Sequence, residues 1–185
     1  MYTVFMSIIS NIKISKALPE DIQKIGDVFY KTWLDTYPNE ELGITFEDIE
    51  DRYKNRNTED VIERGKKAIL EQQGNELFLV AKDGELVVGV CRAFVYPDKN
   101  ELQVIYILPD YQRRGLGRLF WEEVKKFFDV KRVIIVNVAT YNTKAIEFYK
   151  KIGFIDTGKR FSNEKFRFKS GSVIPEMEME ILAIC

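Results

Sequence analysis

The sequence predicts an α/β fold in which a mixed β-sheet carries helices on both faces. Three observations predict it. One strand–helix unit occupies residues 102–128, a second occupies residues 133–153, and a pair of strands joined by a tight turn comes before them. Strand–helix units cover the faces of a sheet, whereas hairpin strands add antiparallel pairs. Together these patterns indicate one mixed sheet with a covered core.

The N-terminal part is expected to hold one strand and three helices. Residues 11–15 alternate apolar and polar side chains, as a half-buried strand does. Pro19 suits the first turn of a helix that follows. Two more helices are expected over 46–54 and 59–73. The first helix places four apolar side chains on one face, namely Ile22, Ile25, Phe29 and Trp33.

The middle of the chain predicts three strands and a helix. Residues 77–82 and 86–96 flank Asp83-Gly84-Glu85, a strong hairpin signal. Residues 102–108 are almost continuously apolar and rich in β-branched side chains, as in a strand covered on both faces. The helix after them carries its apolar stripe at three- and four-residue spacing, with Leu116, Leu119, Phe120, Val124 and Phe127.

The C-terminal part predicts a buried strand, a helix and two more strands. Residues 133–138 are short, apolar and β-branched, and a helix over 142–152 ends at Gly153, a residue type common after helices. Residues 154–169 are expected to form one strand and a loop. The last strand is indicated by Met177, Met179 and Ile181, which alternate with glutamates.

Composition narrows the classes of function. The length of 185 residues suits a single domain, 1–185, in which residues 1–10 can form an N-terminal extension and Met6 an alternative start. A net charge of −1 argues against a general nucleic-acid binder, and residues 1–9 are too short to span a membrane. Cys91 and Cys185 indicate no disulfide framework and fit the cytoplasm. The chain has no histidine, which excludes His-based catalytic triads and zinc sites.

The junction between the central strand and its helix has the features of an anion site. The first turn of a helix leaves backbone N–H groups unpaired, and the helix dipole adds partial positive charge there. Gly115 and Gly117 have no Cβ, so an anion can approach the backbone. Arg113, Arg114 and Arg118 add positive charge. The segment therefore predicts a phosphate or pyrophosphate site, with an ordinary strand-to-helix turn as the alternative.

Two motifs resemble the GNAT superfamily of N-acetyltransferases. The P-loop pattern is absent, and Phe120 replaces the last glycine of a dinucleotide-binding pattern. Gln112-Arg113-Arg114-Gly115-Leu116-Gly117 is similar to the acetyl-CoA motif [Q/R]-x-x-G-x-[G/A]. Residues 142–154 are similar to the family's next helix, N-x-x-A-x-x-x-Y-x-x-x-G-F. The resemblance covers residues 77–154 well and the two ends loosely.

The resemblance implies a fold and a co-substrate. The fold would be a GNAT-like, mostly antiparallel sheet of about seven strands, with a splay between the two central strands. Acetyl-CoA would enter the splay, and no metal would be needed. The implied cofactor-binding residues are Ile107, Leu108, Gln112, Arg113, Arg114, Gly115, Leu116, Gly117, Arg118, Asn142 and Ala145.

The resemblance also implies catalytic roles in acetyl transfer from sulfur to an amine. Tyr149 stands where the family carries its general acid; its alternative role is core packing. Glu101 opens the central strand near the place where several relatives keep a base, and a water chain or a solvated glutamate are the alternatives. Asn142 can cap its helix as well as contact the cofactor.

A further resemblance, to PaiA-type spermidine/spermine acetyltransferases, indicates which amine accepts the acetyl group. It rests on the helical insert over 46–73, on residues 32–37 and on residues 175–179. Acidic side chains could attract a polycation. Rival functions are acetylation of a protein N-terminus or an aminated antibiotic, and a non-catalytic acyl-CoA-binding regulatory module. The expected partner is a small-molecule amine, and a homodimer is compatible with the sequence. The proposed acceptor contacts are Trp33, Asp35, Tyr37 and Glu176, with Glu40, Glu41 and Glu178 as further acidic candidates.

Overall fold

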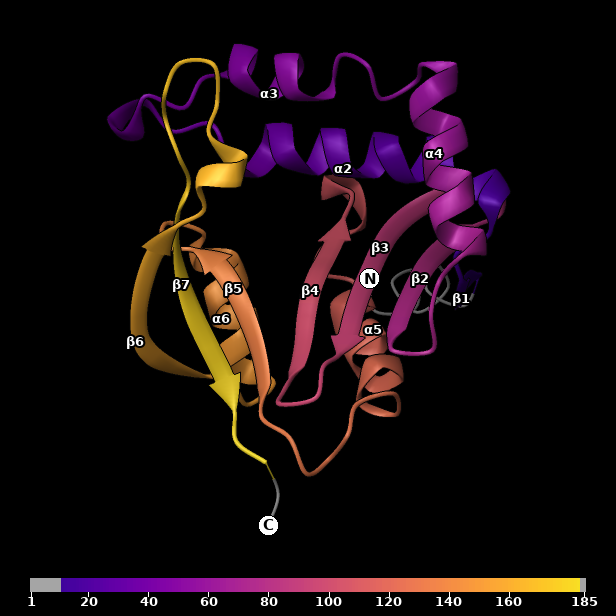
Figure 1. Cartoon of the computed structure of the whole chain (residues 1–185), viewed down its shortest axis with the longest axis vertical. Coiled ribbons are helices and arrows are strands. Elements are labelled where there is room, and N and C mark those ends of the chain that lie inside the picture. The colour runs from indigo at the N-terminus through magenta and orange to yellow at the C-terminus, as the bar shows by residue number, and fades with distance from the viewer. Residues whose placement is uncertain (1–10, 184–185) are drawn as a thin grey trace, which may run out of the picture.

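A computed structural model describes residues 11–183 of the chain, and the expected extension over residues 1–10 lies outside them. Seven strands form one sheet in the order β1-β2-β3-β4-β5-β7-β6. Every neighbouring pair is antiparallel except β4 and β5, which are parallel. The predicted class is therefore confirmed: a mixed, mostly antiparallel sheet with helices (Figure 1).

The observed elements follow the predicted order, with boundaries that move by a few residues. The strands are β1 (Ile12–Lys16), β2 (Glu76–Asp83), β3 (Leu86–Val95), β4 (Asn100–Ile107), β5 (Ile134–Ala139), β6 (Ile155–Ser162) and β7 (Pro175–Ile181). The α-helices are α2 (Ile22–Thr36), α3 (Phe46–Tyr53), α4 (Glu59–Leu70), α5 (Leu116–Lys125) and α6 (Thr143–Lys151). Among the described residues, no helix is long and apolar enough to cross a membrane.

Helices α2 and α5 cover opposite faces of the sheet. The ring of Tyr106 packs edge-on against Phe29 of α2, with centroids 5.2 Å apart. The next side chain of β4, Ile107, approaches Gly117 of α5 instead. Because successive side chains of a strand point to opposite faces, the two helices lie on different sides of β4. This arrangement gives the cleft described below two chemically different walls.

The core has two parts. The larger cluster joins strands β2–β5 and β7 to α2, α5 and α6, and the smaller one lies around Trp33, Ile49 and Phe168. One predicted core residue is wrong: Leu119 of α5 is 41% exposed, because it lies beside the stripe formed by Leu116, Phe120 and Val124 rather than in it.

The loop between β6 and β7 spans the sheet edge and docks on α3 (Figure 1). The Ser170 hydroxyl donates to the Asp48 carboxylate at 2.9 Å, and Lys169 pairs with Asp51 at 2.6 Å. The Arg52 guanidinium lies over the Phe168 ring, 4.8 Å from its centroid. These contacts close the smaller core cluster.

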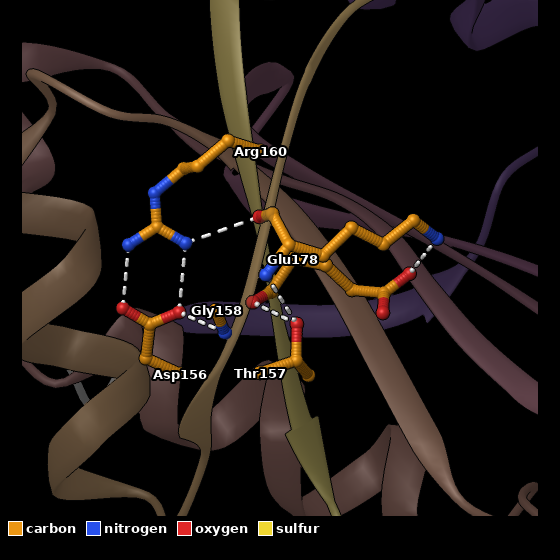
Figure 2. A network of polar contacts seen from close by, with 6 residues as sticks. Asp156, Thr157, Gly158, Arg160 and Glu178 are labelled. Carbon is orange, nitrogen blue, oxygen red and sulfur yellow. Dashed lines mark hydrogen bonds and ion pairs between the residues drawn. The ribbon is translucent and has the colours of Figure 1, made fainter.

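The edge strand β6 is bulged and charged. Asp156 is in register with Met179 but Arg160 with Met177, so the strand carries extra residues between them. Figure 2 shows Arg160 in a two-pronged ion pair with Asp156, whose carboxylate also accepts the Gly158 N–H at 2.8 Å. Such irregular, charged edges disfavour pairing with another strand.

Candidate active site

Strands β4 and β5 run side by side but are paired at only two positions. Asn100 is in register with Ile134 and Glu101 with Ile135, and further along the strands diverge (Figure 1). A cleft of about 1050 Å³ occupies this wedge. The cleft explains why residues 103–107 of β4 are exposed or half-buried, whereas their apolar sequence predicted a strand covered on both faces.

The edge of β4 that faces the wedge carries backbone groups that β3 does not pair. The Leu108 N–H donates to the Val88 carbonyl at 2.9 Å, and the Leu108 carbonyl accepts from Tyr111. Backbone groups alternate sides along an antiparallel strand, so Ile105 and Ile107 turn theirs toward β5. The predicted cofactor contact at Ile107 therefore faces the cleft, whereas the backbone of Leu108 is committed to the protein.

The junction before α5 is the segment for which the sequence predicts an anion cradle. Gly115, the residue before the helix, has φ of 86° and provides no side-chain cap for the first-turn N–H groups. Arg113 also takes a left-handed conformation, with φ of 60°. The side chains of Arg113 and Arg118 line the cleft. Arg114 does not line it, because its guanidinium lies over the Tyr111 ring, 5.1 Å from the centroid.

Two residues of the motif hold the cradle in place. The Gln112 side chain donates to the Ile107 carbonyl at 3.0 Å, which ties the loop to the end of β4. A Cβ at Gly117 would lie 3.1 Å from the Phe148 ring, so the glycine allows α5 and α6 to approach closely. The first function of Gly117 in the structure is thus packing rather than anion approach.

Helix α6 forms the other wall on the same side. The Asn142 side chain caps the helix by accepting the Ala145 N–H at 3.1 Å, so that N–H is not available to a ligand. Lys144 and Lys151 line the cleft and extend its positive charge. The uncapped first turn of α5, these cations and the free edge of β4 fit an elongated molecule with phosphate groups, such as coenzyme A.

Tyr149 of α6 lines the cleft and is only 6% exposed. Burial raises its pKa well above the ordinary value of a tyrosine, and the nearby Tyr106 adds to the increase. The phenol is therefore protonated at neutral pH. This is the state that a proton donor needs.

The opposite wall comes from α2 and its following turn. Thr32, Asp35 and Tyr37 line the cleft there. The Tyr37 and Tyr106 hydroxyls are 2.9 Å apart and hydrogen-bonded, and the Tyr141 hydroxyl donates to the Tyr37 carbonyl at 3.0 Å. Burial raises the pKa of both Tyr37 and Tyr106, so this aromatic wall is neutral.

Besides Leu108 and Arg114, three more predicted site residues lie outside the cleft lining. Trp33 is 8% exposed and packs on Tyr37 with centroids 4.5 Å apart, so it supports the wall without forming it. Glu101 lies at the paired end of the wedge, 4.0 Å from Lys99 Nζ. Glu176 lies close enough to the tyrosine pair for its charge to raise the pKa of Tyr37 and Tyr106.

The further acidic candidates contribute less than the sequence suggested. Glu40 and Glu41 belong to a short 3₁₀ helix away from the cleft lining. Glu178, labelled in Figure 2, forms an ion pair with Lys159, and their charged atoms are 2.9 Å apart. Burial raises the pKa of the carboxyl group of Glu176, the acidic residue close to the tyrosine pair.

Sequence reasoning missed Tyr106, Asn137 and Tyr141, all of which line the cleft. Tyr106 and Asn137 were counted as parts of apolar strands. A polar signal was present: Asn137 interrupts an otherwise apolar run, and a lone amide in a buried strand needs a hydrogen-bond partner.

The sequence profile of the Acetyltransferase (GNAT) family matches residues 29–154. The chain is 32% identical over 101 residues to "Probable N-acetyltransferase san" of Drosophila melanogaster. This alignment covers 48% of the chain, and the chain spans about half the length of that relative, 53%.

Solved structures share the fold at low identity. PaiA N-acetyltransferase of Thermoplasma acidophilum, in complex with coenzyme A, is 21% identical with a TM-score of 0.68, over 91% of this chain and 97% of its own. The structure of yncA from Salmonella typhimurium with acetyl-CoA is 18% identical with a TM-score of 0.64, over 94% and 95%. The ribosomal-protein-S18-alanine N-acetyltransferase of Escherichia coli is 18% identical with a TM-score of 0.58, over 94% and 95%.

Proposed function

Because this chain belongs to the GNAT acetyltransferase family, we propose that it transfers the acetyl group of acetyl-CoA to a polyamine such as spermidine or spermine. The observation that carries the proposal is one cleft with two unlike walls. The wall of α5 and α6 is cationic, and the wall after α2 is aromatic, with acidic groups on and near it. The first suits the phosphates of coenzyme A and the second suits a cationic amine.

The cofactor half of the cleft would hold coenzyme A along its length. We assign the pyrophosphate to the backbone between Gln112 and Arg118, with Arg113 and Arg118 as charge partners. The wedge-facing backbone of Ile107 and Ile105 would bind the pantetheine arm. Acetyl-CoA supplies an acetyl group activated as a thioester.

We assign Tyr149 as the general acid that protonates the departing sulfur. Because its pKa is raised, the phenol stays protonated until the sulfur departs. The amine must lose a proton before it attacks, because its pKa is close to that of lysine, about 10. Glu101 lies outside the cleft lining, so we assign the removal of this proton to water in the cleft rather than to Glu101.

The acceptor half supports a polyamine. Asp35 lines the cleft and is exposed, and Glu176 is a half-buried carboxylate near Tyr37. Asp35 can bind one ammonium group of the chain directly, and Glu176 can attract a second one from outside the lining, with the tyrosines against the methylene groups. The sequence resemblance to PaiA-type enzymes, together with the fold shared with PaiA, supports the same acceptor.

The test is a CoA-release assay with spermidine, spermine, lysine, N-terminal peptides and aminoglycosides. We expect the highest kcat/KM with the polyamines, and we expect Asp35→Asn to lower it for spermine more than for a monoamine. A preference for peptides would replace the polyamine by a protein N-terminus. That second candidate is favoured by the fold shared with the ribosomal-protein-S18-alanine N-acetyltransferase.

A further inference from the structure

One buried polar atom in the cleft has no partner among the described residues. The Asn137 Oδ1 is shielded from solvent and accepts no hydrogen bond from the protein, although Asn137 lines the cleft. A buried carbonyl oxygen without a donor destabilises the fold. The oxygen is therefore a candidate for a hydrogen bond to a ligand in the cleft.

The position of Asn137 on β5 places it at the opening of the wedge. The last residue of β5 in register with β4 is Ile135, two positions earlier. From there on, the β4-facing edge of β5 borders the cleft. Asn137 is thus the first polar side chain of β5 to meet a molecule held between the strands.

Strand alternation shows which wall Asn137 belongs to. Its neighbours Val136 and Val138 belong to the larger core cluster, which draws on both α6 and α2 and so assigns no side. Ala139 packs instead with Trp33 of α2. Since Asn137 and Ala139 share a face, the Asn137 side chain lies on the acceptor side of the sheet and not on the side of α6.

The protein groups around Asn137 leave its oxygen available. Ile135 and Ala139, which share its face along β5, are apolar. Glu178 lies directly opposite on β7, but a carboxylate accepts hydrogen bonds and cannot donate one at neutral pH. The charge of Glu178 is already paired with Lys159, at 2.9 Å.

We propose that the Asn137 Oδ1 binds the reacting nitrogen of the acceptor amine, accepting one of its N–H groups. This inference rests on the proposed transfer to an amine. A side-chain amide is neutral and takes no proton, so its contribution is orientation: it holds one N–H and leaves the lone pair of the nitrogen free to attack. The proton that the amine loses still passes to water.

The test compares Asn137→Leu, which has the same shape without an acceptor, with the wild type. We expect kcat/KM for the amine to fall about 10- to 100-fold, the loss of one well-placed hydrogen bond. The dissociation constant of CoA, measured by calorimetry, should stay within about twofold, and the melting temperature should not fall. Asn55→Leu, on an exposed residue between α3 and α4, is the matched control and should change neither quantity.

A comparison of several acceptor amines distinguishes the proposed Asn137 contact from recognition of the amine's charge by Asp35. Because Asn137 would bind the nitrogen that reacts, Asn137→Leu should lower kcat/KM by the same factor for a monoamine, spermidine and spermine. The decrease of kcat/KM in Asp35→Asn should instead grow with the number of ammonium groups on the acceptor.

Two results would overturn the inference. If Asn137→Leu weakens CoA binding and leaves the amine kinetics unchanged, the oxygen serves the cofactor; if it changes neither, water satisfies the oxygen. Asn137→Ala provides the same readouts if the leucine variant does not fold. A wild-type protein that acetylates no amine would instead contradict the proposed function itself.

Discussion

At the scale of single residues, the cleft depends on groups whose surroundings set their chemistry. Tyr149 is a case in which packing and chemistry coincide. Its ring packs against Phe148 and Phe154, with centroids 5.4 and 5.6 Å away, and the residue also lines the cleft. Both roles that the sequence left open, core packing and proton donation, are therefore compatible with one position.

Tyr149→Phe should separate these two roles. The ring remains, so we expect the free energy of unfolding and the affinity for CoA to stay close to wild type. Loss of a positioned acid should lower kcat about 10²- to 10⁴-fold, measured by CoA release. Tyr111→Phe is the matched control, because its hydroxyl bonds Asp83 outside the cleft lining. Unchanged turnover in Tyr149→Phe would remove the assigned acid.

A substitution at Gly115 tests the backbone conformation of this position without a side-chain clash. The φ of this glycine is 86°, and a Cβ there would meet no atom within 4 Å. We expect Gly115→Ala to lower the free energy of unfolding by about 1 kcal/mol, the strain of a left-handed conformation. Affinity for CoA should fall as well, because the first turn of α5 would be displaced.

Gly84→Ala provides the control for this strain. Gly84 also has a positive φ, 56°, with open space around it, but it lies in the β2–β3 turn. Chemical denaturation should give a similar loss of stability, with unchanged binding of CoA by calorimetry. Equal CoA affinities in the two variants would show that the cradle tolerates movement.

At the scale of elements, the docked β6–β7 loop ties the C-terminal strands to α3. Asp48 stands at the centre of this contact, because its carboxylate accepts from Thr45 at the start of α3 and from Ser170 of the loop. Partial burial tends to raise the pKa of Asp48, but these hydrogen bonds outweigh it and hold the pKa below its ordinary value.

A lowered pKa implies stability that is lost in acid. The contribution of Asp48 is fully present above the unfolded-state pKa of about 3.9 and disappears as pH falls through the lower folded-state value. We therefore expect Asp48→Asn to reduce the free energy of unfolding at pH 7 by about 1 kcal/mol and to flatten its decline below about pH 4. Urea denaturation at a series of pH values measures both.

Asp60→Asn is the control for Asp48, because this exposed carboxylate pairs only with Arg64 on the surface of α4. Its substitution should leave the acid limb of the stability curve as in wild type. If both variants behave alike, the loop does not depend on the Asp48 hydrogen bonds.

At the scale of the whole molecule, the splay divides the sheet into two wings joined at few backbone pairs. Strands β1–β4 form one wing and β5–β7 the other. Coenzyme A in the wedge would contact both wings, so its binding energy should add to the stability of the whole fold.

Thermal unfolding measures this bridging effect. At a CoA concentration of 100 times Kd, linkage gives about 2.7 kcal/mol, and we expect a rise in Tm of about 5–10 °C for a chain of this size. Adenosine at the same concentration lacks the pantetheine arm that reaches between the strands, and it should produce little change. A matching rise with adenosine would place the ligand outside the wedge.

Local patterns predicted most of the fold and the cofactor half of the site. Alternation, apolar stripes and turn residues depend on near neighbours in the chain, so β2, β3, α5 and α6 were placed within a few residues. The cradle before α5 was equally local, since Gly115 and the two arginines of the cleft lie within six residues. Here the sequence alone determined the family of fold, and it predicted the anion cradle and the tyrosine to examine.

Only the tertiary structure decided what faces the acceptor. Three features depend on where β5 diverges from β4. They are the hydrogen bond between Tyr37 and Tyr106, the position of Glu101 at the paired end of the wedge, and the Asn137 oxygen that has no hydrogen-bond partner. That divergence brings together residues separated by 30 to 100 positions, and no periodicity within one segment encodes such a distance. Contacts across a wedge are set by the packing of whole elements. The sequence therefore proposed Asp35 and Tyr37, which line the cleft, but could not show that Tyr106 and Asn137 line it with them.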